Sequence, residues 1–189
     1  MHSRLVGFNL FKSLVHGDSR GLFLEWVNED LLNSLPAPFV LAQGNMSISK
    51  FGVVRGMHFS TLPQTKILIC AHGTIQDYAV DLRLNSPSFG KSDSFTLDSK
   101  SRDTVVIDPG LAHGFEVLSE DATLIYLTNL KYSPETDYAL NVFDSEIEIS
   151  IGHANPIISE RDLSAPSLQK LLGDGIIDEI QQVRDFRSG

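Results

Sequence analysis

The sequence predicts a mainly β fold, a sandwich or a barrel, built from many short strands. Apolar segments rich in Val, Ile, Phe and Thr recur along the chain, as strands require. Turn-forming residues such as Asn85-Ser86-Pro87 and Asp108-Pro109-Gly110 separate them at fairly even spacing. The predicted strands are residues 53–54, 66–70, 74–82, 104–107, 115–118 and 123–128.

Helical signals occur in two places. Residues 28–32 predict a short helix between strands, and residues 164–184 predict a helical tail. In the tail we expect Ser164 to cap the helix and Pro166 to lie early in it, with glycines at 173 and 175 dividing it in two. The whole chain, residues 1–189, is therefore expected to be one domain, with a β core at about 5–155 and a tail at about 160–189.

Composition narrows the class of protein. Hydrophobic residues make up 42% of the 189 residues, enough for a substantial core. The net charge of −9 argues against nucleic acid or an anionic membrane as the main partner. We see no signal peptide and no apolar run near membrane-spanning length, so a cytoplasmic protein is expected. The single cysteine, Cys70, lies in an apolar run and is predicted to be a buried, unreactive thiol.

The segment from Arg55 to Phe59 contains the first candidate site residues. A regular strand would send Arg55 and His58 to opposite faces, but Gly56 between them allows a bulge that turns both inward. Metal-binding barrels usually supply several histidines and a carboxylate, whereas this strand has one histidine and the next polar strand residue is Lys66. The pattern therefore predicts no metal site.

Two further segments contain candidate site residues. His113 lies between glycines at 110 and 114, which indicates either a tight strand start or a purely structural turn. Tyr126 and Tyr132 lie near a predicted strand end, where a tyrosine is either a packed aromatic or an acid.

Seven motifs, taken in order, resemble those of the dTDP-4-dehydrorhamnose 3,5-epimerase family, and the resemblance runs from about residue 5 to 170. The motifs are Gly17-Asp18-Ser19-Arg20-Gly21, Gln43-Gly44-Asn45-Met46-Ser47, Arg55-Gly56-Met57-His58-Phe59, Asp77 to Arg83 followed by Ser86 to Gly90, Ala112-His113-Gly114-Phe115, Tyr132-Ser133-Pro134-Glu135 and Ser159-Glu160-Arg161-Asp162. The resemblance implies a cupin-type jelly roll.

It also implies a reaction on dTDP-4-keto-6-deoxy-glucose. Protons beside the C4 ketone, at C3 and C5, are exchanged through an enolate, which requires a base, an acid on the opposite face and a positive group at the oxygen. By resemblance His58 is the base, Asp162 its partner and Tyr132 the acid. Lys66 stabilises the enolate oxygen.

The resemblance further implies a binding set, no cofactor and a homodimer in which N-terminal strands cross to the partner. Residues 5–14 are apolar enough to form such a strand. The implied substrate-binding residues are Arg20, Glu25, Gln43, Asn45, Arg55 and His113, with the two arginines suited to the diphosphate. Structural roles remain open for some of the set: Asp162 as a helix cap, Lys66 as a solvated edge residue and Glu25 as a residue facing water.

Three other functions are compatible with the same residues. A single epimerase acting only at C3 or at C5 uses the same histidine and tyrosine. A non-catalytic cupin that binds nucleotide sugars would not need an acid and a base together. A metal-dependent cupin isomerase would contain a stoichiometric metal ion.

Overall fold

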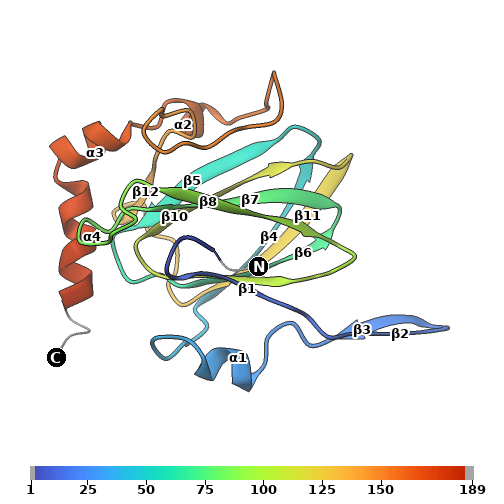
Figure 1. Ribbon diagram of the computed structural model, residues 1–189. Coiled ribbons are helices and arrows are strands. Elements are labelled where there is room, and N and C mark those ends of the chain that lie inside the picture. Colours follow the sequence, from blue (N-terminus) through green and yellow to red (C-terminus); the bar gives the residue numbers. More distant parts are fainter. Residues whose placement is uncertain (1–2, 186–189) are drawn as a thin grey trace.

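Two facing antiparallel sheets form the body of the protein (Figure 1). The computed structural model describes residues 3–185. The first sheet has the order β1 (Phe8–Phe11), β9 (Thr104–Ile107), β6 (Lys66–His72), β11 (Asp121–Thr128) and β4 (Gln43–Lys50). The second has the order β12 (Asp137–Ala139), β5 (Val54–Ser60), β10 (Leu111–Val117), β7 (Thr74–Asp81) and β8 (Ser92–Asp98). The mainly β prediction is confirmed.

A separate two-stranded hairpin, β2 (Val15–Asp18) and β3 (Gly21–Leu24), extends away from the two sheets (Figure 1). The strand before it, β1, pairs antiparallel with β9 of the same chain, with Phe8 opposite Ile107. Because β1 is an edge strand, its second edge has no partner among the described residues of this chain, and the crossing of residues 5–14 to a partner stays a prediction.

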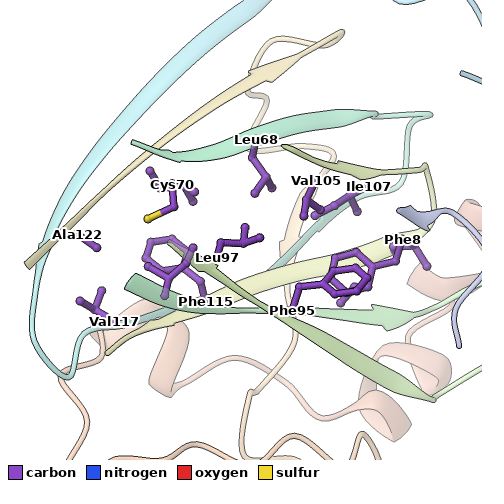
Figure 2. Packing of buried hydrophobic residues seen from close by; sticks show 14 of the residues in the cluster. Phe8, Leu68, Cys70, Phe95, Leu97, Val105, Ile107, Phe115, Val117 and Ala122 are labelled. Atoms are coloured by element: carbon purple, nitrogen blue, oxygen red, sulfur yellow. The ribbon is translucent and has the colours of Figure 1, made fainter. Parts of the chain in front are cut away.

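The main core fills the space between the sheets (Figure 2). Alternate residues of each strand point inward, so β6 contributes Leu68 and Cys70 while β10 contributes Phe115 and Val117. Cys70 is fully buried, as predicted, and burial raises the pKa of its thiol to about 11, which keeps it protonated.

A second apolar cluster lies on the outer face of the second sheet. There Met57, Phe59 and Val80 pack against tail residues such as Leu168 and Ile177. The tail thus covers a sheet face that would otherwise expose apolar side chains, and it fixes the chain around residue 160 against β5.

The helices follow local capping signals. Asn28 caps α1 (Glu29–Asn33), which confirms the first predicted helix. The tail forms α2 (Glu160–Leu163), α3 (Leu168–Gly173) and α4 (Ile176–Asp185). The prediction that Ser164 caps the tail helix is wrong: Ser164 ends α2, and Ser167 caps α3 by accepting a hydrogen bond from the Lys170 N–H. Among residues 3–185 no helix combines the length and apolar character needed to span a membrane.

Candidate active site

A cavity of about 360 Å³ opens between the two sheets. Strands β4, β6 and β11 of one sheet and β5 and β10 of the other line it, together with the segment that follows β11. The structure brings seven of the predicted site residues to its wall: Gln43, Asn45, Arg55, His58, Lys66, His113 and Tyr132. Residues far apart in sequence therefore converge on one site, as an active site requires.

A bulge in β5 places Arg55 and His58 on the same side, as the glycine between them predicts. His58 pairs with His113 and Arg55 pairs with Phe115, so two residues of β5 face Gly114 alone. Gly56 has φ +109°, and a Cβ there would lie 2.6 Å from the Gly114 Cα. Only two glycines in contact allow this approach of β5 to β10.

Asp162 lies directly behind His58. The His58 Nε2 is 2.7 Å from the Asp162 Oδ1, and the Gly56 N–H donates to the other carboxylate oxygen at 3.2 Å. Burial alone would raise the pKa of Asp162, but these hydrogen bonds and the charge of His58 outweigh it and hold that pKa below its usual range. Asp162 is thus ionised and accepts the Nε2 proton of His58, which leaves Nδ1 as the basic nitrogen. The α2 cap is Ser159, so Asp162 is not the capping residue.

Lys66 is enclosed by protein. It is 8% exposed and its Nζ donates to the His58 backbone oxygen at 3.1 Å. Burial lowers the pKa of Lys66 to about 8, against the opposing effect of the negative charges of Asp137 and Asp77. Lys66 is therefore a fixed cation at neutral pH, placed 8 residues from His58 in sequence but beside it in space, and not a solvated edge residue.

A second histidine–aspartate pair lies next to the first. The His113 Nε2 is 2.7 Å from the Asp77 Oδ1, and Asp77 is 0% exposed. Burial raises the pKa of Asp77 against the effect of His113 and Lys66, and burial lowers the pKa of His113 against the effect of Asp77. Asp77 opens one of the motifs quoted above, but it was given no role there. Residue type does not distinguish it either, because strand β7 also contains Gln76 and a second buried aspartate, Asp81.

Tyr132 lies at the mouth of the cavity and is 56% exposed. Its backbone N–H donates to the Gln43 Oε1 at 2.9 Å, and the Gln43 Nε2 donates to the Asn45 Oδ1 at 2.7 Å. This chain of hydrogen bonds ties the loop that carries Tyr132 to strand β4. Cavity residues that were given no role from the sequence include Ser47 and Arg161, which lie in the quoted motifs, and Gln64 and Asp137, which do not; Tyr126 also faces the cavity.

Arg20 and Glu25 lie outside this cavity. Arg20 is on the β2–β3 hairpin, where its guanidinium pairs with Asp18 at 2.6 Å in an exposed position. Glu25 follows β3 and lines a small separate hollow together with Trp26 and Phe11. A single copy of the chain therefore does not bring these two residues to the other site residues.

Within residues 3–185 no group of three or more His, Cys, Asp or Glu side chains is arranged to hold a metal ion. The polar groups of the cavity include two histidines backed by carboxylates, a lysine, two arginines and two tyrosines. Such a set can remove a proton, return one and stabilise a negative oxygen.

Comparison with known proteins finds relatives that are described as sugar epimerases. Residues 2–170 match the family described as dTDP-4-dehydrorhamnose 3,5-epimerase. The protein of that name from Mycobacterium tuberculosis is 35% identical over 178 residues, which cover 91% of this chain and 88% of the relative. A dTDP-4-dehydrorhamnose 3-epimerase of Streptomyces niveus is 38% identical and covers 85% and 79%. The structure of ChmJ, a 3′-monoepimerase from Streptomyces bikiniensis in complex with dTDP-quinovose, aligns over both whole chains with a TM-score of 0.90 at 30% identity.

Proposed function

Because the chain belongs to the dTDP-4-dehydrorhamnose 3,5-epimerase family of sugar epimerases, we propose that it inverts C3 and C5 of dTDP-4-keto-6-deoxy-glucose. The observation that carries the proposal is the His58–Asp162 pair, which faces a cavity that also holds Lys66 and Tyr132. A binding protein has no use for a base, a cation and an acid around one cavity. The cupin-type jelly roll of the family is the fold described above.

The reaction needs a base at a carbon that is acidic only because of its neighbouring ketone. His58 removes the proton through Nδ1, and Asp162 stabilises the imidazolium that forms. The electron pair moves to the ketone oxygen, where the buried ammonium of Lys66 stabilises the enolate. A preorganised donor of this kind contributes roughly 3–4 kcal/mol to the transition state.

Inversion requires that the new proton arrive on the opposite face of the sugar. Tyr132 is the proposed acid, because it lines the same cavity from a different segment than His58 and is connected through Gln43 to the cavity wall. Arg55 is the proposed diphosphate ligand, since its guanidinium lies at the cavity and is oriented by a 3.0 Å hydrogen bond from its Nε to the Ser49 Oγ. No cofactor takes part in these steps.

Deuterium exchange tests the function directly. With dTDP-4-keto-6-deoxy-glucose in D₂O, we expect NMR to show deuterium entering both C3 and C5, with inversion at both. Exchange at one carbon would identify a single epimerase, an outcome that the likeness to the monoepimerase ChmJ makes worth resolving. No exchange at either carbon would contradict the proposed function and favour a binding protein.

A metal-dependent isomerase is tested separately. Undiminished exchange after chelation, with no stoichiometric metal in the purified protein, separates this mechanism from a metal-dependent isomerase.

The variant Tyr132→Phe should separate the loss of the proton from its return. We expect deuterium exchange to persist while inversion falls by about 10²- to 10³-fold, because the base is intact and the acid is missing. Tyr138→Phe is the matched control, since its hydroxyl bonds the Glu135 backbone oxygen outside the cavity wall. Equal loss of exchange and inversion in Tyr132→Phe would contradict its role as the acid.

We further propose a homodimer in which the β2–β3 hairpin reaches the partner's cavity. Edge strand β4 exposes Met46 and Ile48 on its outer face, and the hairpin exposes Leu22 and Phe23. Contiguous exposed apolar side chains of this kind indicate an interface. Such an arrangement would deliver Arg20 and Glu25 to the site from which they are missing in one copy.

Mixing two inactive variants tests this arrangement. We expect Arg20→Ala to lose about 10²-fold in kcat/KM and His58→Asn to be nearly inactive, each for loss of a different half of the site. After subunit exchange, mixed twofold dimers would restore one complete site each, up to roughly a quarter of wild-type activity. A monomer in light scattering, or no recovery in mixtures that demonstrably contain mixed dimers, would contradict the proposal.

A further inference from the structure

The two histidine–aspartate pairs have the same contact distance but opposite surroundings. In each pair the histidine Nε2 lies 2.7 Å from a carboxylate Oδ1. Asp162 receives a second donor, the Gly56 N–H, on its other oxygen. The Oδ2 of Asp77 is buried and has no hydrogen-bond partner.

This difference determines which of the two carboxyl groups is protonated. An ionised carboxylate needs donors on both oxygens, and leaving one bare in the protein interior is costly. A neutral carboxyl group tolerates it far better, because its hydroxyl donates and its other oxygen carries little charge. Asp77 is 0% exposed, and burial raises its pKa despite His113 and Lys66, so the geometry and the electrostatics both favour the protonated form.

A protonated Asp77 fixes the tautomer of His113. If the carboxyl group donates to Nε2, that nitrogen accepts, and a neutral imidazole must then carry its own proton on Nδ1. Burial lowers the pKa of His113, which keeps the ring neutral. His113 lines the cavity, and with Nε2 engaged by Asp77 the nitrogen left for a ligand is Nδ1.

Resting on the function proposed above, we propose that Asp77 is a positioning residue that makes His113 a hydrogen-bond donor to the ketone oxygen of the substrate. The protonated Asp77 donates to Nε2 of His113, and the Nδ1–H of His113 donates to the oxygen that becomes negative in the enolate. His58, with an ionised partner, has a bare Nδ1 and acts as a base; His113, with a neutral partner, has a protonated Nδ1 and acts as a donor.

The position of Lys66 supports this division of roles. Lys66 lies on the sheet that faces His113, and its charge interacts with Asp77 and Asp137. Of these two carboxylates, Asp137 raises the Lys66 pKa more, so with Asp77 neutral it is Asp137 that keeps the ammonium charged. Lys66 and His113 together then form the oxyanion site.

The tautomer can be measured without substrate. In protein with ¹⁵N-labelled histidine, long-range ¹H–¹⁵N correlation spectra distinguish a proton on Nδ1 from one on Nε2, and the spectrum of His113→Asn assigns the signal. We expect His113 to carry its proton on Nδ1 and to lose this preference in Asp77→Leu, which keeps the side-chain shape without a donor. A bare Nδ1 on His113 in the wild type would overturn the proposal.

Kinetics provide the second test. We expect Asp77→Leu to lower kcat by about 10- to 100-fold with KM changed by less than about threefold, because it acts on the oxyanion and not on substrate binding. In a His113→Asn background the same change should have little further effect, since Asp77 acts through His113. Asp77→Asn, which retains an N–H opposite Nε2, should keep more activity than Asp77→Leu.

Losses that add independently in the double variant, or a wild-type kcat in Asp77→Leu, would overturn the role of Asp77 while leaving the epimerase function in place. An inactive wild type would instead contradict the proposed function, and the tautomer measurement would still decide the state of His113.

Discussion

We expect His58→Asn to lower kcat by about 10³- to 10⁴-fold, because the substitution removes the only base that the mechanism supplies at C3 and C5. The asparagine can still accept and donate hydrogen bonds beside Asp162, so the cavity keeps its shape. In D₂O neither carbon should take up deuterium, whereas the affinity for dTDP, which the nucleotide end of the site sets, should change by less than about twofold.

His72→Asn is the matched control. His72 lies on β6 with its side chain exposed and paired with Asp121 at 3.1 Å, outside the cavity. It should retain wild-type exchange at both carbons. If His58→Asn kept more than a few per cent of the wild-type exchange rate, another group would have to be the base, and Tyr126 and His113 would be the groups to test next.

Lys66→Met should lower activity and raise stability at the same time. Loss of the buried ammonium removes the positive charge at the enolate oxygen, so we expect kcat to fall by about 10²- to 10³-fold. In the wild type the ammonium form is the active one. Activity should therefore decline as the pH rises through the Lys66 pKa of about 8.

The ammonium group that favours catalysis at the same time destabilises the folded protein. The unfolded chain binds the Lys66 proton more tightly than the folded protein, because the pKa falls from 10.5 to about 8 on folding. Protonated Lys66 thus costs the folded state about 3 kcal/mol below pH 8, and the cost disappears as the pH rises toward 10.5. Lys66→Met should raise the free energy of unfolding by roughly 1–3 kcal/mol at pH 7 and remove this pH dependence.

Denaturant unfolding at pH 7 and pH 10 measures both quantities. Lys91→Met, at an exposed position between β7 and β8 and outside the cavity, is the control and should change neither activity nor stability appreciably. A less stable Lys66→Met protein would mean that the lysine is held by interactions stronger than the cost of its burial, and the assignment of a strained, functional cation would be wrong.

Strands with buried apolar runs could be predicted from residue type, whereas the cavity strand β4 could not. β6 and β9 are runs of Val, Ile and Leu because both of their faces are buried. β4 has the opposite pattern: its polar residues Gln43, Asn45 and Ser47 point inward to the cavity and Met46 and Ile48 point outward. A rule that places apolar residues inside would assign the wrong face of β4 to the interior, so only the resemblance to the family motif pointed to these polar residues as site residues.

Among the site residues, those in short motifs could be found and those fixed by tertiary contacts could not. The bulge at Gly56 was predictable because glycine between two polar residues allows the extra residue. The partnership of His113 with Asp77, 36 residues apart, depends on the pairing of β10 with β7, which no local pattern encodes. For Arg20 the reverse is true: a local motif identifies the residue, but Arg20 lies away from the cavity of its own copy of the chain.

The contact between Gly56 and Gly114 also limits how this active site can be redesigned. Any side chain at Gly56 meets the backbone of β10, and any at Gly114 would lie 2.6 Å from the Met57 Sδ and 2.7 Å from the Arg55 backbone oxygen. Gly56 and Gly114, on the two strands that carry His58 and His113, therefore tolerate no substitution. The mouth of the cavity around Tyr132 is exposed and can accept larger or smaller residues. Engineering for a different sugar must work from this mouth, with the proton-transfer groups kept as a fixed unit.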